Sequence, residues 1–343
     1  MVMTFVNSAE PGLVSVHLPV RNGERHIAEA VESILAQSLR DFELVLVDHS
    51  STDGTPGILS DFAGKDGRVN LLRYEGDNFI ESLNFGLSRC RGEFIARMDS
   101  DDISSPERLE LQLGYLRENP GIAVVGSGVE IFGEDVMEGY RRYEEWINSI
   151  SKPDEIKREI FVESPLPNPS VMMRRVYMER MGGYEDHGWP EDYDLWLRSV
   201  LKGEPMAKLP EKLLRWREHG KRLTRNSRRY SKKSFLKVRA YYLTRFLEGR
   251  KIVLHGTGPT GKILGRYLLD YGADLKAYLD INPRKAGGTK NGLPVYPASE
   301  KGRFRRDGYM LLAAVTSWGA RDDIKSEAEI AGYVEGVDFI CCS

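Results

Sequence analysis

Three carboxylates lie close together in the stretch Asp99-Ser100-Asp101-Asp102, at the end of a segment that contains the apolar run 94–96. Like charges held within about 4 Å repel by roughly 4 kcal/mol at an effective dielectric near 20, so such a cluster favours a bound cation. Mg²⁺ prefers one or two protein carboxylates together with phosphate oxygens, which predicts a substrate that carries phosphate. The alternative is that one of these carboxylates caps the helix that Pro106 begins.

A second acidic group, Glu191-Asp192-Tyr193-Asp194, follows the glycine pair Gly182-Gly183. Apolar residues at 195, 196 and 200 predict that this group opens a helix with one buried face. The helix dipole keeps carboxylates at a helix N-terminus ionised, and an ionised carboxylate can accept a proton from a reacting hydroxyl. On these residues alone, ordinary N-terminal capping by Glu191 and Asp192 is the simpler interpretation.

The elements that must position these groups alternate along the first hundred residues. Nearly continuous apolar runs predict buried strands, and apolar residues at helical spacing predict helices between them. The predicted strands are 13–20, 42–47, 69–74 and 93–98, and the predicted helices are 27–35, 55–62 and 78–89. This order indicates an α/β fold with a parallel sheet covered on both faces.

Ligands of such sheets bind beyond the carboxyl ends of the strands, and three polar segments fall there: 19–24, 48–55 and the acidic cluster. Asp48 ends the second strand, where its carboxylate is suited to accept hydrogen bonds from a nucleotide base or ribose. It is also suited to cap the next helix, although Asp53 or Thr55 can do that instead.

Several motifs resemble, in order and spacing, those of the family 2 glycosyltransferases, over about the first 220 residues. They are VSVHLPVRNGE at 14–24, ESILAQS at 32–38, FELVLVDHSSTDGT at 42–55, NFGL at 84–87, GEFIARMDSDD at 92–102 and PERL at 106–109. The resemblance implies a GT-A fold, in which a nucleotide-binding, mostly parallel sheet continues into an acceptor-binding part.

The resemblance also implies roles for single residues. The residues that would line the nucleoside pocket are Pro19, Asn22, Glu24 and Asp48. Asn84 would support the diphosphate or sugar, Asp99 would face the ribose or sugar, and Asp101 would ligate Mg²⁺ or Mn²⁺. Asp102 is left to serve the turn that follows. Two positions depart from the family pattern. Arg21 stands where the family usually has an aromatic residue, and His49 stands where it usually has a second Asp.

In the acceptor half, the resemblance changes the interpretation of the second acidic group. Gly-Gly-Tyr followed by Glu-Asp-Tyr-Asp-Leu-Trp resembles the acceptor-site motif of the family, which implies that Asp192 is the catalytic base, with Glu191 as the alternative and Asp194 structural. The Arg217-Glu218-His219 stretch resembles an Arg-x-His element that closes over the diphosphate, so His219 is a candidate metal ligand. Lys212-Leu213-Leu214-Arg215-Trp216 lacks the Gln of the processive synthases, which indicates transfer of single sugars.

Composition limits the remaining classes. At 343 residues the chain predicts two domains, and 49 basic against 51 acidic residues argue against a nucleic-acid-binding protein. The three cysteines have no metal-ligand spacing, and neither a membrane span nor a signal peptide is found, so a cytoplasmic protein is expected.

The segment 212–251 is strongly basic, with 15 Lys and Arg against two Glu. We expect a basic helical linker at 226–250. One possibility is that its basic side chains form a solvated surface. The other is that they contact an anionic membrane leaflet that carries a lipid-linked acceptor, which would place the protein peripherally on the inner face of the membrane.

A second nucleotide-fold signature follows at 251–343. A strand runs into the turn Gly256-x-Gly258-x-x-Gly261, and Asp280 follows Gly258 by 22 positions, the spacing of a ribose-binding acid. These four residues form a candidate second nucleotide site in a small Rossmann-like domain. The glycines can also serve only close helix–strand packing, in which case the domain serves interaction or homo-oligomerisation. The 93 residues after 250 suffice for about half a doubly wound domain.

The sequence therefore predicts a GT-A domain at 1–225, a linker, and a Rossmann-like domain at 251–343. The predicted activity is metal-dependent, inverting, non-processive transfer of a sugar (hexosyltransferase type) from a nucleoside diphosphate sugar to a saccharide or lipid-linked acceptor, in surface polysaccharide or glycoconjugate biosynthesis. One alternative is an NAD-dependent sugar-nucleotide oxidoreductase that works through 256–280. Another is a non-catalytic sugar-nucleotide-binding assembly subunit.

Overall fold

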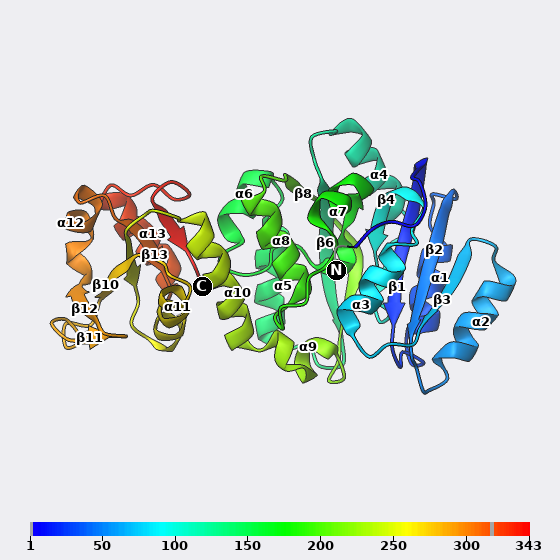
Figure 1. The fold of residues 1–343 in the computed structure, drawn as a ribbon, viewed down its shortest axis with the longest axis horizontal. Coiled ribbons are helices and arrows are strands. Elements are labelled where there is room, and N and C mark those ends of the chain that lie inside the picture. Colours follow the sequence, from blue (N-terminus) through cyan, green and yellow to red (C-terminus); the bar gives the residue numbers. More distant parts are fainter. Residues whose placement is uncertain (1–2, 316–318) are drawn as a thin grey trace. The chain divides into compact units, whose positions relative to one another are not determined.

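The computed structural model describes residues 3–315 and 319–343, which form two compact units. The first unit contains the chain through Ile156, then Pro165–His187 and Glu191–Asn226. The second contains Lys157–Ser164, Gly188–Pro190 and Ser227–Ser343. Each unit is built on its own sheet (Figure 1).

The sheet of the first unit has the strand order β3-β2-β1-β4-β7-β6-β8-β5. Its strands are β1 (Glu10–Val20), β2 (Phe42–His49), β3 (Val69–Tyr74), β4 (Gly92–Arg97), β5 (Ile103–Ser104), β6 (Val124–Gly133), β7 (Met172–Arg174) and β8 (Met206–Glu218). β1 to β4 run parallel, as their apolar runs predict, whereas β7 is antiparallel to both β4 and β6. The predicted α/β fold with a mostly parallel sheet is confirmed.

Helices follow most strands of this unit. They are α1 (Ile27–Leu35), α2 (Thr55–Lys65), α3 (Phe79–Leu87), α4 (Arg108–Glu118), α5 (Glu138–Ser149), α6 (Pro153–Glu159), α7 (Arg175–Met181), α8 (Glu191–Leu201) and α9 (Leu223–Asn226). In α1, Ile27, Ala30, Val31 and Ile34 are fully buried, at the spacing of one helical face. This stripe joins a core with the inward residues of β1, β2 and β4.

The register of the parallel strands places three strand ends together. Val20 of β1 lies beside Asp48 of β2, and His17 of β1 lies beside Arg97 of β4. Because β1 lies between β2 and β4, the loops after these three strands emerge side by side. The expectation that the three polar segments share one rim of the sheet is confirmed.

The second unit is a complete small doubly wound sheet. Its strands are β9 (Ile252–His255), β10 (Leu275–Asp280), β11 (Thr289–Lys290), β12 (Leu293–Pro297), β13 (Met310–Ala313) and β14 (Phe339–Cys341). Its helices of four residues or more are α10 (Lys232–Phe246), α11 (Pro259–Asp270), α12 (Lys301–Arg306) and α13 (Ala320–Ile330). Strands β12, β10, β9, β13 and β14 are parallel in that order, which in chain order is 3-2-1-4-5, as in Rossmann domains.

Two expectations about this part of the chain were wrong. The residues after 250 form all five parallel strands rather than half a domain, because several strands are only three to five residues long. The segment 226–250 is no linker: from Ser227 on it belongs to the second unit, and α10 packs against α11 with Leu236, Val238 and Leu243 buried. Apolar residues at helical spacing join α10 to a core despite its charge.

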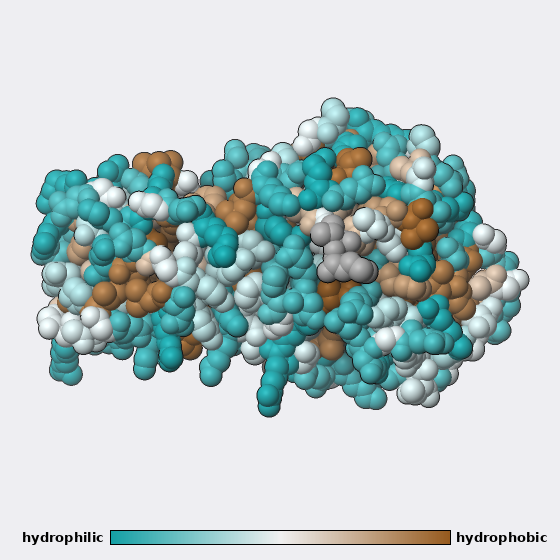
Figure 2. Space-filling view, viewed as in Figure 1, coloured by the Kyte–Doolittle hydropathy of each residue, from teal (hydrophilic) through white to brown (hydrophobic). Residues whose placement is uncertain are grey.

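The surface seen in Figure 2 is mostly hydrophilic, with hydrophobic residues in small separate patches. Within the described residues, no helix combines the length and the apolar character needed to span a membrane.

Candidate active site

The acidic cluster follows β4 directly. One carboxylate oxygen from each of Asp99, Asp101 and Asp102 lies within 4.8 Å of the other two. The alternative role of capping is wrong for this cluster. The N-cap residue of α4 is Glu107, which makes no side-chain capping bond, and the N–H of Leu109 in the first turn donates to Oε1 of Gln37 at 3.0 Å.

Strand β8 brings a histidine to this cluster. Nε2 of His219, just after β8, lies 2.9 Å from Oδ2 of Asp101. The preceding Arg217 holds the two segments together, since its backbone N–H donates to Oδ1 of Asp102 at 2.8 Å and its Nε donates to the backbone carbonyl of Asp101 at 2.7 Å. Asp102 therefore bonds to β8 instead of serving the turn that follows it.

This donor set fits a hard divalent ion. Adjacent ligands of an octahedral ion with bonds of 2.0–2.1 Å lie about 3 Å apart, which is close to the separation of the Asp101 and His219 atoms. The Asp101 carboxylate suits Mg²⁺ or Mn²⁺, whereas an imidazole nitrogen such as that of His219 is a softer ligand that suits Mn²⁺ better than Mg²⁺. The side chain of Asp99 is partly exposed.

Two buried arginines balance the charge of the cluster, and the sequence patterns did not identify either. Arg97, at the end of β4, is 4% exposed, and its Nη2 lies 2.8 Å from Oδ1 of Asp99. Arg222, three residues after His219, is also buried and pairs with Glu218 at 3.2 Å. A cation inside a buried strand, as at Arg97, is the sequence signal that was available.

The neighbouring carboxyl groups of Asp101 and Asp102 have pKa values shifted in opposite directions. Burial would raise the pKa of Asp101, but the hydrogen bond with His219 and the charge of Arg222 hold that pKa below its usual value. Burial, followed by the charge of Asp101, raises the pKa of Asp102 well above its usual value. Asp101 is thus the anionic member that is suited to bind a cation.

The predicted nucleoside-pocket residues tie two loops of the rim together. Oδ1 of Asn22 accepts the backbone N–H of Thr52 at 2.8 Å, and Oε2 of Glu24 accepts that of Gly54 at 2.7 Å. Asn22 adopts a positive φ of 54°, which lets the first loop turn toward the second. Pro19 is buried in β1 beside Val47 of β2.

Asp48 is the penultimate residue of β2 and is 3% exposed. Its Oδ1 accepts the backbone N–H of Ser51 at 3.1 Å, and its Oδ2 lies 3.7 Å from Nε of Arg73. Just before α2, whose N-cap residue is Gly54, Oδ1 of Asp53 accepts the N–H of Thr55, the first helical residue, at 3.0 Å. Asp48 therefore shapes the loop after β2 and is not needed to cap the helix.

The two positions that depart from the family pattern lie on the same rim. Nε2 of His49 lies 2.9 Å from the carbonyl of Gly76, and its ring packs edge-on against Tyr74. Arg21 is exposed.

Asn84 of α3 holds the acceptor half in place. Its Nδ2 donates to the carbonyl of Tyr184 at 2.8 Å, and its Oδ1 accepts the backbone N–H of Tyr184 at 2.9 Å. A Cβ at Gly183 would lie 2.6 Å from Oδ1 of Asn84, so a glycine is required at this approach. Asn84 thus fixes the turn that leads to the second acidic group.

Asp192, in the first turn of α8, is partly buried, and its Oδ1 accepts the N–H of Tyr193 at 2.7 Å. Burial raises the pKa of Asp192 to about 6, against the Tyr193 hydrogen bond, and the charge of Asp99 adds to the rise. A carboxyl group with this pKa can take up a proton near neutral pH. The mutual charge effect places Asp192 within electrostatic range of the acidic cluster, while Glu191 beside it is 4% exposed.

Comparison with known proteins agrees with this arrangement. The model of glycosyl transferase family 2 matches residues 15–182. EpsE of Bacillus subtilis is 35% identical over 223 residues, which are 64% of this chain and 77% of that protein. The chain belongs to glycosyl transferase family 2. It is a glycosyltransferase.

Other relatives of the chain carry more specific names. The amylovoran biosynthesis glycosyltransferase AmsE of Erwinia amylovora is 31% identical over 60% of this chain and 76% of its own length. The O-antigen biosynthesis glycosyltransferase WbnJ of Escherichia coli is 29% identical over 70% and 91%. The crystal structure of S. aureus TarS 1-349 in complex with UDP-GlcNAc has a TM-score of 0.55 at 19% identity, covering 74% of this chain and 71% of that one, which supports the GT-A fold.

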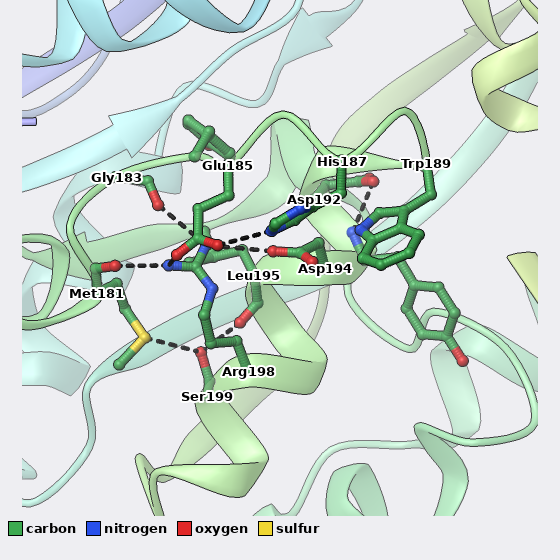
Figure 3. A network of polar contacts seen from close by, with 12 residues as sticks. Met181, Gly183, Glu185, His187, Trp189, Asp192, Asp194, Leu195, Arg198 and Ser199 are labelled. Carbon is green, nitrogen blue, oxygen red and sulfur yellow. Dashed lines mark hydrogen bonds and ion pairs between the residues drawn. The ribbon is translucent and has the colours of Figure 1, made fainter. Parts of the chain in front are cut away.

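Asp194 of this family 2 transferase is buried in a polar network around Arg198 of α8 (Figure 3). Nη2 of Arg198 lies 3.3 Å from Oδ2 of Asp194 and donates to the carbonyl of Gly183 at 3.0 Å, and Nη1 lies 3.1 Å from Oε1 of Glu185. Asp194 thus anchors the arginine that holds the glycine turn, which agrees with a structural role.

The candidate second nucleotide site of the transferase lies in its other unit. Gly256 has φ +111°, and a Cβ at Gly261 would lie 1.9 Å from the Gly256 carbonyl, so both glycines serve close packing, whereas a Cβ at Gly258 would meet open space. Asp280 accepts the N–H groups of Thr257 and Asn282, the Thr257 hydroxyl and Nζ of Lys285. Its acceptor positions are taken by its own chain. Nucleotide binding here stays a prediction.

Proposed function

We propose that this family 2 enzyme transfers one sugar at a time, with inversion, from a nucleoside diphosphate sugar to a saccharide or lipid-linked acceptor in surface polysaccharide or glycoconjugate assembly. The observation that carries the proposal is the pairing of two sites. A cation-binding cluster at Asp101 and His219 lies within electrostatic range of Asp192, a carboxyl group whose pKa is about 6.

Asp101 and His219 would hold the divalent ion, Mg²⁺ or Mn²⁺, with Asp99 toward the donor sugar. Such an ion acts as a Lewis acid that neutralises charge on the departing diphosphate. Asp48, Asn22 and Glu24 would shape the nucleoside pocket through the two loops that they organise.

The residues of the chain account for the remaining charge and proton movements. Asp192 removes the proton of the acceptor hydroxyl, whose oxygen forms a bond to the anomeric carbon as the bond from that carbon to the diphosphate oxygen breaks. The electron pair of the broken bond leaves with the diphosphate. Arg222, buried beside the cluster, offsets part of the negative charge that gathers there.

A single displacement at the anomeric carbon requires one base and inverts the configuration. Asp194, which pairs with Arg198, is not available as a second nucleophile. The absence of the processive Gln element at Lys212 supports transfer of single sugars. Relatives named for amylovoran and O-antigen biosynthesis support the class of pathway, and the UDP-GlcNAc complex of TarS supports the class of donor.

The test compares Asp101→Asn with Asp61→Asn, an exposed carboxylate of α2. Thermal-shift screening of nucleoside diphosphate sugars with and without Mn²⁺ first identifies the donor, and release of nucleoside diphosphate then measures turnover. We expect metal-dependent donor binding and turnover in the wild type and in Asp61→Asn, and loss of both in Asp101→Asn.

Full activity of Asp101→Asn would refute the metal-cluster assignment. Reduction of NAD⁺ by a sugar nucleotide without release of nucleoside diphosphate would instead favour the oxidoreductase alternative.

A further inference from the structure

Charge is divided unevenly between the two parts of the chain. Residues 227–343 contain 21 Lys and Arg against 12 Asp and Glu, a net charge of +9. Residues 1–226 contain 28 against 39, a net charge of −11. The near neutrality of the whole protein therefore hides a strongly basic second unit, and such asymmetry is typical of proteins that meet an anionic surface.

The exposed face of α10 concentrates this charge. Lys233, Lys237, Tyr241 and Arg245 follow one another at intervals of four, which places them in one row along the helix. The three basic residues, here called the basic stripe, are exposed. The sequence of α10 contains no Asp or Glu, and its opposite face is buried in the second unit.

The positive charge of the basic stripe has no ion-pair partner among the described residues. Nor does any ion pair within the described residues involve Lys232, the first residue of α10, or Arg228, which lies four residues before it. Elsewhere in the unit such pairs are frequent, as between Arg305 and Asp338 at 2.7 Å. Lysines in the first turn also oppose the helix dipole. The arrangement costs stability that an external anionic partner would recover.

Aromatic rings underlie the stripe and limit what it can recognise. The guanidinium of Arg245 lies 3.3 Å from the ring centroid of Tyr241, and Nζ of Lys237 lies 5.9 Å from that of Trp189, which is 5% exposed. Single-stranded nucleic acids need open ring faces on which bases stack. A row of long cationic side chains on a rigid helix presents charge to a broad surface instead.

We propose that the basic stripe of α10 docks the protein on the surface of an anionic lipid bilayer. Each basic residue near such a surface strengthens binding by about fivefold, and the attraction fades within a Debye length of about 10 Å at 0.1 M salt. Membrane docking would hold the enzyme where lipid-linked saccharides are found.

The test is flotation of the full chain with vesicles of phosphatidylcholine alone or of phosphatidylcholine with phosphatidylglycerol, at low and high salt. Lys233→Glu/Lys237→Glu removes two charges of the stripe without touching the Arg245–Tyr241 contact. The matched control is Arg284→Glu/Arg306→Glu, which makes the same charge change at two exposed residues of the same unit for which no ion pair is found within the described chain.

We expect the wild type and the control to float with the anionic vesicles only, and to be released by salt. Binding of the stripe variant should fall by at least about 25-fold. Failure of the wild type to bind at low salt, or equal binding by the stripe variant, would overturn the proposal. Binding to RNA or polyphosphate without binding to vesicles would also overturn it, in favour of a soluble polyanion. The assay uses neither donor nor acceptor, so its outcome is independent of the proposed transfer reaction.

Discussion

Asp101 and His219 lie 118 positions apart in the chain, and their Oδ2 and Nε2 atoms are 2.9 Å from each other. The short strand β5 explains this contact. It follows the acidic cluster directly and pairs antiparallel with β8, with Ile103 beside Arg215 and Ser104 beside Leu214. Two backbone segments are thereby fixed next to each other, so the carboxylate and imidazole meet without depending on a mobile loop.

Removal of His219 should weaken metal binding more than it weakens the fold. In His219→Ala, we expect the Mn²⁺ concentration for half-maximal activity to rise by about 10-fold or more, since loss of even an outer partner of a metal ligand costs 10- to 100-fold. His26→Ala is the control, because the His26 ring lies 5.4 Å from that of His219 and is not in the predicted ligand set. An unchanged Mn²⁺ requirement in His219→Ala would exclude His219 as a ligand.

The pH dependence of turnover should report Asp192. A base must be ionised to act, so kcat should rise with pH and reach half its plateau near pH 6, the raised pKa of Asp192. The charge of Arg97 lowers this pKa, so in Arg97→Gln the half-point should move to higher pH. Measurement of kcat as a function of pH in both proteins gives the shift. A kcat that reaches half its plateau near pH 4 in the wild type would argue against Asp192 as the base.

Asp192 and Asp194 are two positions apart and should respond in opposite ways to replacement by Asn. Asp194→Asn removes one carboxylate partner of the buried Arg198, while Glu185 remains as the other. The free energy of unfolding should therefore fall by about 2 kcal/mol. The folded protein should keep its turnover. Asp192→Asn should lower kcat by about 10² to 10⁴. It should not lower stability at pH 7, because burial disfavours the charged carboxylate that it removes.

Urea denaturation and turnover of both variants test this pair of expectations. Equal loss of stability in the two variants, or retained turnover in Asp192→Asn, would contradict the division of roles.

The glycine turn of the second unit should tolerate a methyl group at one position only. A Cβ at Gly261 would lie 1.9 Å from the Gly256 carbonyl, so Gly261→Ala should cost about 1–3 kcal/mol, whereas Gly258→Ala should change stability by less than about 0.5 kcal/mol. Hydrogen exchange of the amides in β9 and α11 measures the effect within this unit. Similar protection in the two variants would show that the turn relaxes more easily than its backbone geometry indicates.

Local patterns were sufficient for the first part of the fold. The apolar runs and helical spacing between residues 13 and 98 correctly predicted β1 to β4 and α1 to α3, and their ends predicted the shared rim. Periodicity works there because each element buries one continuous stripe or run. The assignment of Asp192 required the family resemblance, because an acidic pair at a helix start also fits a simple cap.

The acidic cluster shows most clearly where the sequence alone stops. From residue order and charge one can predict that Asp99, Asp101 and Asp102 follow a buried strand, and that carboxylates so close together favour a cation. The folded chain is needed to see that the Asp101 side chain pairs with His219, that of Asp102 accepts the backbone N–H of Arg217, and that of Asp99 pairs with Arg97. The physical reason is that hydrophobic patterns act along a few consecutive residues, whereas the partners and pKa of a carboxylate depend on strands distant in the chain. Here the distant strand is β8, which the adjacent β5 holds beside the cluster. β5 is too short, and β8 too irregular in register, for a periodic pattern to show.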